Sequence, residues 1–353
     1  MKTLVIFLSF VIALPAYPCT RILSTTQNKE VIVGRNMDWP EDTQSNFWVF
    51  PRGMAREGLA GNNPAKWTSK YGSMILSVYD VGTADGINEK GLTANLLYLS
   101  ESDFGARNDK IPGVSVSLWA QYFLDNFATV DEAVTSLRNS PIQVLNASVH
   151  TVVGPKEGTV HLAISDKTGD TAVIEYIAGQ PQIYHSRNYK VMTNSPPFDE
   201  QLKGLKQYKG FGGDKELPGT TAAADRFVRA AFYEERLPKT SDYREAIAGV
   251  LSVLRNVSQP FGESDPIRPY ISTTRWRVVA DLTKGTYFYE NTMSPNIVWV
   301  QTAKLNFKPG SGVRKIGLVK NYDLIGDITG QFKPAMPFKF LKPNMTAGLK
   351  AQN

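Results

Sequence analysis

The sequence predicts an α+β protein in which antiparallel sheets are covered by helices. Segments with strand patterns and segments with helical spacing form separate blocks, in the order strands, helices, strands, helices, strands. The regular alternation of strand and helix that marks a doubly wound parallel sheet does not occur. Of the 353 residues, 42% are hydrophobic and 20% are charged, as in globular proteins. Neither a repeat nor a linker is evident, so we expect a single domain over residues 19–353.

The first block contains five expected strands, because alternating or β-branched runs are separated by turn sequences. The strands cover residues 20–25, 30–33, 47–50, 74–79 and 92–99. Two helices follow, one over about 114–127 and one that begins at Thr129. Thr129 and Glu132 have the spacing of a capping box, and Pro141 ends this second helix.

The remaining blocks repeat this arrangement. Strands are expected over 159–165, 171–177, 182–185 and 189–193, and helices over about 222–236 and 243–255. The second of these helices carries apolar residues at helical spacing: Ile247, Val250, Leu251 and Leu254. A last group of strands covers 274–282, 286–290 and 297–305. From Gln331 the chain is rich in proline and lysine, and we expect an extended tail there.

The N-terminus is typical of an export signal. Lys2 is followed by an apolar run over 4–14 that only Ser9 interrupts, and then by small residues and prolines. Such a run is too short to span a bilayer but suits a signal peptide. We therefore expect residues 1–18 to be a signal peptide with any short pro-segment. The protein would then be periplasmic or secreted, without a stable membrane anchor.

Cys19, the only cysteine, stands at the expected start of the processed protein. Three interpretations remain open: an N-terminal nucleophile, a lipid-modified cysteine on a non-catalytic binding protein, or an unused thiol. A free α-amine has a pKa of about 7.7–8.0, so it can act as a general base near neutral pH. On a residue that also carries a thiol, it can replace the histidine of other cysteine hydrolases.

Other chemistries find little support in the sequence. The net charge of +6 is spread along the chain, and its densest cluster, Lys203, Lys206 and Lys209, has the spacing of a solvated helix face. We therefore expect no nucleic-acid partner. The three histidines, at 150, 161 and 185, lack zinc-site spacing, although a Cys–His dyad remains possible.

Several motifs resemble the choloylglycine hydrolase family, which includes penicillin V acylases and bile salt hydrolases. They are Cys19-Thr20-Arg21, Gly34-Arg35-Asn36-Met37-Asp38-Trp39, Ala84-Asp85-Gly86-Ile87-Asn88-Glu89-Lys90-Gly91-Leu92, Met192-Thr193-Asn194-Ser195-Pro196 and Leu217-Pro218-Gly219 before Arg226-Phe227. The resemblance implies a four-layer αββα sandwich and an N-terminal cysteine nucleophile. It implies neither a metal ion nor a cofactor.

Six residues are implied as catalytic by this resemblance. Cys19 matches the nucleophile, and Arg35 and Asp38 match the charged pair beside it. Since residues three apart on a strand point to opposite faces, this pair should converge only if the strand ends or bulges near Asn36. Asn194 matches the asparagine that stabilises the oxyanion, and Arg226 matches a second active-site arginine. Tyr98 matches the position whose backbone N–H is the other oxyanion donor.

The substrate is less closely defined. Trp39, Phe47 and Trp48 are candidates for an acyl pocket, with burial in the sheets as the alternative. Tyr98 favours a penicillin V acylase over a bile salt hydrolase. We expect cleavage of a small N-acyl amide, with N-acyl homoserine lactones or conjugated bile salts as alternatives. The resemblance also implies that the protein forms a homo-oligomer, namely a homotetramer.

Overall fold

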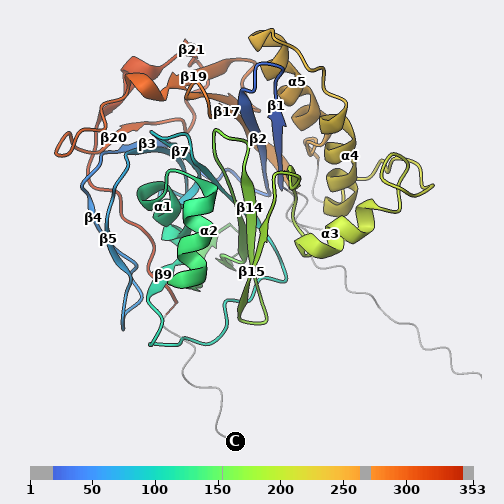
Figure 1. Cartoon of the computed structure of the whole chain (residues 1–353). Coiled ribbons are helices and arrows are strands. Elements are labelled where there is room, and N and C mark those ends of the chain that lie inside the picture. Colours follow the sequence, from blue (N-terminus) through green and yellow to red (C-terminus); the bar gives the residue numbers. More distant parts are fainter. Residues whose placement is uncertain (1–18, 153, 263–271, 345–353) are drawn as a thin grey trace, which may run out of the picture.

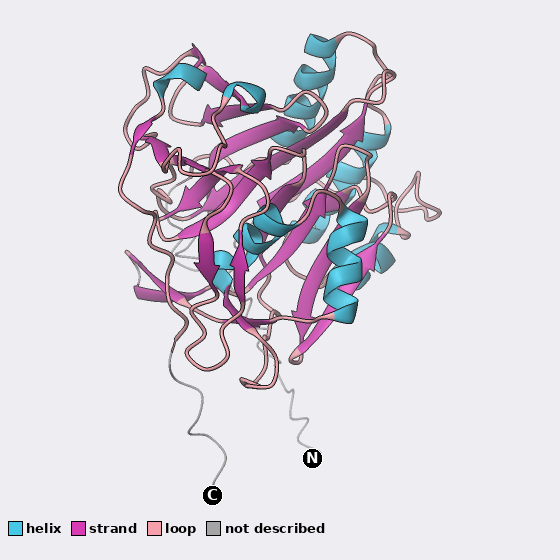
Figure 2. Ribbon diagram, turned by 60° about the vertical axis from the view of Figure 1, so that its left-hand side comes forward, coloured by secondary structure: helices cyan, strands magenta, loops and turns pink. Residues whose placement is uncertain are grey.

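The computed structural model confirms the predicted fold class. It describes residues 19–152, 154–262 and 272–344, so the predicted signal segment lies outside the described residues. Two sheets stack face to face in the middle of the molecule (Figure 2). Helices α1 and α2 lie on one side of the strands and α4 and α5 on the other (Figure 1). These are the four layers of an αββα sandwich.

The first sheet has seven strands and carries Cys19. Its order is β16 (Val191–Met192), β1 (Cys19–Thr25), β2 (Val31–Trp39), β17 (Thr273–Asp281), β18 (Thr286–Asn291), β19 (Ile297–Gln301) and β21 (Gly326–Asp327). Strands β1 and β2 are antiparallel, and their register places Cys19 opposite Met37. The first residue of β1 thus lies beside the end of β2.

The second sheet has nine strands. Their order is β15 (Gln180–His185), β14 (Thr171–Ile177), β13 (Val160–Ser165), β8 (Thr93–Tyr98), β7 (Gly82–Asn88), β6 (Ser73–Val78), β3 (Phe47–Phe50), β20 (Arg314–Ile316) and β22 (Lys333–Pro334). Three short pairs of strands lie outside both sheets. They are β4 (Ala55–Glu57) with β5 (Lys66–Thr68), β9 (Gly113–Ser115) with β10 (Gln143–Leu145), and β11 (Ser148–Thr151) with β12 (Gly154–Glu157).

The helices cover the outer faces of the sheets. Helices α1 (Val116–Asn126) and α2 (Val130–Asn139) pack on the nine-stranded sheet, and α4 (Ala223–Glu235) and α5 (Tyr243–Asn256) pack on the seven-stranded sheet. Helix α3 (Phe198–Leu205) packs on α4, and two 3-10 turns cover Thr302–Lys304 and Thr329–Gln331. One hydrophobic core fills the space between the sheets and under α4 and α5, and another lies under α1 and α2. Among the described helices, none is both long and apolar enough to cross a membrane.

The structure differs from the predicted elements at several places. Strand β2 extends six residues beyond the predicted end at 33, and β7 and α3 were not predicted as elements. The strand expected over 189–193 is reduced to Val191–Met192. The described part of the tail, residues 331–344, pairs through β22 and packs along the nine-stranded sheet.

Candidate active site

Cys19 lies at the meeting point of three chain segments. Its side chain is only 2% exposed. The sulfur is 3.9 Å from Sδ of Met37 and 3.8 Å from the carbonyl oxygen of Asp38, both at the end of β2. Its backbone nitrogen donates a hydrogen bond to Oδ1 of Asn194, in the loop after β16. Burial and these contacts fix both reactive groups of the residue, the sulfur and the nitrogen.

Arg35 and Asp38 point to opposite faces of a regular strand. The expectation that β2 ends or bulges near Asn36 was wrong, because β2 runs to Trp39 and the bulge lies in its partner β17, between Thr274 and Trp276. Both residues still reach Cys19 because it is the first residue of β1. Its sulfur lies on the face that carries Met37 and Arg35, and its backbone is reached from the face that carries Asp38.

Arg35 crosses the space between the sheets. Its guanidinium donates to the carbonyl oxygens of Ala84 on β7, at 2.8 Å, and Leu96 on β8, at 2.5 Å. Its Nη1 also lies 3.2 Å from a carboxylate oxygen of Asp85. The ring of Trp276 lies 5.0 Å from the guanidinium carbon. Arg35 therefore joins the two sheets directly beside the cysteine.

Arg226 reaches Cys19 from helix α4, on the other face. Its Nη1 donates to the carbonyl oxygen of Cys19 at 2.7 Å and to the hydroxyl of Thr20 at 2.5 Å. Its Nη2 donates to Oδ1 of Asn194 at 3.1 Å. Nη1 also lies 3.8 Å from Oδ2 of Asp38. One buried arginine thus orders the backbone of the cysteine, the amide and the carboxylate.

Asn194 links the two sheets next to the cysteine. Its Oδ1 accepts from the nitrogen of Cys19 and from Arg226, and its Nδ2 donates to the carbonyl oxygen of Tyr98 at 2.7 Å. Its own carbonyl oxygen accepts from the side chain of Gln201. The orientation of the amide is therefore fixed, with the nitrogen toward the end of β8.

Burial dominates the ionisation of the site. It raises the pKa of the Cys19 thiol above its ordinary value, although the positive charges of Arg35 and Arg226 act in the opposite direction. Burial also raises the pKa of Asp38 to about 6, against the lowering effects of Arg226 and of a hydrogen bond from the Thr274 hydroxyl. The neutral thiol is therefore favoured, and a nucleophile here requires a base.

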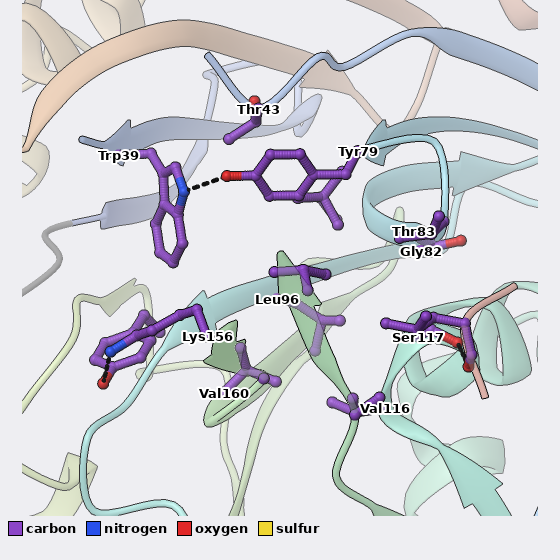
Figure 3. Close-up of a pocket in the computed structure, with 18 of the residues that line it drawn as sticks. Trp39, Thr43, Tyr79, Gly82, Thr83, Leu96, Val116, Ser117, Lys156 and Val160 are labelled. Atoms are coloured by element: carbon purple, nitrogen blue, oxygen red, sulfur yellow. Dashed lines mark hydrogen bonds between the residues drawn. The ribbon is translucent and has the colours of Figure 1, made fainter. Parts of the chain in front are cut away.

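A largely apolar cavity opens beside the sulfur. Its empty volume, which includes space open to solvent at the mouth, is about 800 Å³. Figure 3 shows Trp39 and Tyr79 on one side of it and Val116 and Val160 on the other. The indole N–H of Trp39 donates to the hydroxyl of Tyr79 at 2.7 Å. The rest of the wall includes apolar side chains, among them Met37, Val78, Val81, Leu96, Tyr98, Val149 and Leu341, and polar ones, among them Arg35, Thr43, Thr83, Ser117, Lys156 and Glu157.

The structure brings seven of the nine predicted site residues together. Trp39 and Tyr98 line the cavity and their rings are in edge contact, with centroids 6.3 Å apart. The expectation for Phe47 and Trp48 needs correction. Phe47 packs between the sheets against Tyr287 and Tyr289, and Trp48 packs in the core under α1 and α2, so neither residue lines the cavity. Alternate residues of one strand face opposite sides, and neither side of β3 at these positions reaches the cavity.

The histidines have other partners in the structure. Buried His161 lies 2.7 Å from Glu175, and His185 lies 2.8 Å from Asp170. His150 belongs to β11. Among the described residues, the hydrogen bonds of Cys19 involve Met37, Asp38, Asn194 and Arg226 but no histidine. This geometry gives no support to a Cys–His dyad.

Comparison with known proteins agrees with this geometry. Residues 19–313 match the model of the linear amide C–N hydrolases, choloylglycine hydrolase family. The chain belongs to this family. The resemblance inferred from the sequence motifs is thereby confirmed, and this choloylglycine hydrolase family member is a hydrolase of linear amides.

Individual members of the family can also be compared with this chain. The family member is 46% identical over 332 residues to the penicillin V acylase of Pectobacterium atrosepticum, an alignment that covers 88% of each chain. It is 28% identical over 309 residues to the bile salt hydrolase/transferase of Clostridium perfringens, over 79% of this chain and 90% of that protein. The solved structure of penicillin V acylase from Agrobacterium tumefaciens superposes with a TM-score of 0.83 at 48% identity, and covers 92% of this chain and 99% of that one.

Proposed function

We propose that this family member hydrolyses penicillin V and related N-acyl amides with Cys19 as an N-terminal nucleophile. The observation that carries the proposal is the apolar cavity that opens at the Cys19 sulfur and is lined by Trp39, Tyr79 and Tyr98. Aromatic and aliphatic walls suit a phenoxyacetyl or fatty acyl group. Similarity to two penicillin V acylases over most of the chain supports the same substrate class.

Catalysis requires that the peptide bond between Pro18 and Cys19 is cut first. An amide nitrogen is not basic, whereas a free α-amine has a pKa of about 7.7–8.0 and accepts a proton near neutral pH. The amine would stand where the backbone nitrogen of Cys19 now contacts Oδ1 of Asn194. It takes the proton of the thiol, and the thiolate then attacks the carbonyl carbon of the substrate amide.

The tetrahedral intermediate places a negative charge on the former carbonyl oxygen. Asn194 is oriented with its Nδ2 toward the end of β8, and its amide carries two N–H groups. We assign one donor of the oxyanion hole to this amide and the other to the backbone N–H of Tyr98. Donors placed where charge develops are among the largest contributions to catalysis.

The intermediate collapses with cleavage of the C–N bond. The α-ammonium of Cys19 returns its proton to the leaving nitrogen, so the amine product departs neutral and a thioester remains. Water, deprotonated by the same α-amine, attacks the thioester, and the acid is released with the thiol restored. The ionised Asp38 stabilises the ammonium form of the amine. Arg226 contacts Cys19, Asn194 and Asp38 and so holds them in position relative to one another.

Replacement of Cys19 tests this proposal. Cys19→Ser and Cys19→Ala should keep the fold, measured by thermal melting, and lose nearly all hydrolysis of penicillin V, because only the nucleophile changes. Met293→Ala, at a site that is 61% exposed, is the matched control and should keep full activity. Full turnover by folded Cys19→Ala would exclude the proposed nucleophile.

A substrate panel separates the alternatives. Penicillin V, N-acyl homoserine lactones and glycine- or taurine-conjugated bile salts present different acyl groups to the same site. The proposal expects higher kcat/KM for penicillin V or the acyl lactones than for the bile salts, because the aromatic cavity favours flat or linear groups. Faster turnover of bile salts would reassign the substrate class.

Export is a further part of the proposal. It rests on the sequence of residues 1–18, where Lys2 precedes an apolar run. Mass spectrometry of the secreted or periplasmic protein should show an unmodified Cys19 at the N-terminus. A diacylglyceryl adduct would support the lipid-anchored binding protein instead, because a thioether cannot act as the nucleophile.

A homotetramer is the assembly that we propose, on the family resemblance. Light scattering coupled to size exclusion should give four times the mass of the processed chain. A monomeric mass at catalytic concentration would refute this assembly.

A further inference from the structure

We propose that the C-terminal strap, defined as residues 331–344, forms the distal wall of the acyl cavity, and that Leu341 limits the length of the acyl group. This inference rests on the proposed function and adds a specificity-determining residue to it. The strap lies beyond residue 313, where the match to the family model ends. Family membership alone therefore does not indicate which residue stands at this position.

Aromatic packing anchors the strap to the nine-stranded sheet. The ring of Phe338 lies 5.0 Å from Trp48 and 5.7 Å from Phe50, measured between centroids. Phe340 lies 6.2 Å from Phe50, and the guanidinium of Arg56 lies over both of these rings. Trp48 does not line the cavity itself, but it is part of the surface on which the strap packs.

Leu341 itself is held by its backbone. Its N–H donates to the carbonyl oxygen of Val81 at 2.9 Å. Its carbonyl oxygen accepts from the hydroxyls of Ser115, at 2.7 Å, and Ser117, at 2.8 Å. Val81, Ser117 and Leu341 all line the cavity. Three hydrogen bonds therefore fix the leucine in the cavity wall, so that it is not a loose tail residue.

Cys19 and Leu341 both line the cavity, but they lie on opposite sides of the nine-stranded sheet. Cys19 belongs to the core between the sheets, whereas Leu341 packs against the core on the far side, under α1 and α2. Strands β7 and β8 are paired only as far as Asp85 opposite Asn95. Beyond this pair the two strands separate, and the carbonyl oxygens of Ala84 and Leu96 accept hydrogen bonds from Arg35. An acyl group bound at the sulfur can extend through this opening, and Leu341 stands on the side where it would end.

The strap also holds the β11–β12 hairpin that contributes to the cavity. The backbone N–H of Asn344 donates to the carbonyl oxygen of Asn146 at 2.9 Å. The side chain of Asn344 exchanges two hydrogen bonds with Ser148, at 3.0 and 2.8 Å. Val149 and Lys156 of this hairpin line the cavity. The strap is thus joined to two parts of the wall.

Opposite changes of volume at Leu341 test the inference. 6-Aminopenicillanic acid acylated with straight chains from hexanoyl to dodecanoyl keeps one leaving group while the acyl length varies. Leu341→Ala should raise the ratio of kcat/KM for dodecanoyl over hexanoyl by about tenfold, and Leu341→Phe should lower it similarly, since a small change of apolar volume in a pocket alters kcat/KM by at least about tenfold. Met336→Ala, in the same strap but 82% exposed, should keep the wild-type ratio.

The outcomes separate this inference from the proposed function. If both Leu341 variants melt as cooperatively as the wild type and keep its ratio, the strap does not set acyl length, and the proposed function stands. A ratio that moves in the same direction in both variants would equally overturn the inference. If the wild type hydrolyses neither penicillin V nor any member of the series, the proposed function fails, and this inference fails with it.

Discussion

Thr274→Val tests the role of the Asp38 carboxylate through the pH dependence of hydrolysis. Asp38 is fully buried, and burial raises its pKa to about 6, while Arg226 and the Thr274 hydroxyl act in the opposite direction. In the proposed mechanism the ionised carboxylate stabilises the α-ammonium of Cys19. Protonation of the α-amine itself lowers activity below about pH 8, and the fall should become steeper as the pH drops through about 6, because the Asp38 carboxylate then becomes protonated as well.

The size of the effect follows from the hydrogen bond that is lost. A hydrogen bond to a charged group contributes roughly 1.5–3 kcal/mol, and about 1.4 kcal/mol corresponds to one pH unit. Without the hydroxyl of Thr274, the pKa of Asp38 should rise by about one to two pH units, and the steeper part of the acid limb of kcat/KM should move up with it. Since the pKa of Asp38 is already higher than in an unfolded chain, its ionisation disfavours the folded state as the pH rises through about 6. The ionised form is therefore required by activity and not by stability.

The assay is kcat/KM for penicillin V from about pH 5 to about pH 9. Thr274→Ser is the matched control, because it keeps the hydroxyl and should keep the wild-type acid limb. The hydroxyl of Thr274 also accepts from the backbone N–H of Gln259 at 2.8 Å, so thermal melting of both variants is needed alongside. Superimposable pH profiles for folded Thr274→Val and Thr274→Ser would refute the assigned role of Asp38.

Three further predictions concern the oxyanion hole and the strap. Asn194→Ala should lower kcat by about 10²–10³ because one oxyanion donor is lost, and a decrease below about tenfold would contradict that role. Tyr98→Phe should change kcat by no more than about threefold, since a backbone N–H is the proposed donor; a loss as large as that of Asn194→Ala would assign the phenol to catalysis. Phe338→Ala should lower the free energy of unfolding by about 3 kcal/mol in urea, because the ring packs against Trp48 and Phe50; an unchanged value would mean that the strap is not anchored there.

Local patterns predicted those elements whose signals are local. The bounds of β3 and β14 agree with the predicted strands 47–50 and 171–177, where turn residues flank apolar runs. The predicted capping box of Thr129 and Glu132 is present at the start of α2. In these segments, propensity and pattern agree with the tertiary fold.

Strand β7 was missed because its residues are small. Its sequence, Gly82–Asn88, has little β propensity, and pairing with β6 and β8 determines its conformation. The small residues are needed for close packing. A Cβ at Gly86 would lie 2.8 Å from Ile75 and 2.9 Å from Leu124 of α1. Such a requirement arises from the packed structure and leaves no periodic pattern in the sequence.

The residues of the candidate site also fall into two groups, those with a signal in the sequence and those without one. Cys19, Arg35 and Asp38 lie in two adjacent strands, and their motifs indicated them. Thr274 had no signal in the sequence, since its contact with Asp38 joins positions 236 residues apart. Leu341 had none either, because only the seating of the tail on the nine-stranded sheet brings it to the cavity.

The N-terminus of the active species provides the most direct test of the central claim, that the α-amine of Cys19 is the base. Cleavage of the signal peptide after Ala16 would leave Tyr17 and Pro18 in front of Cys19. As these two residues are removed, intact-mass spectrometry and penicillin V hydrolysis can be followed in the same samples. The mechanism predicts that the rate rises in proportion to the fraction of chains that begin at Cys19, and that folded chains retaining Tyr17 and Pro18 are inactive. Full activity in protein whose mass still includes Tyr17 and Pro18 would show that another group takes the thiol proton.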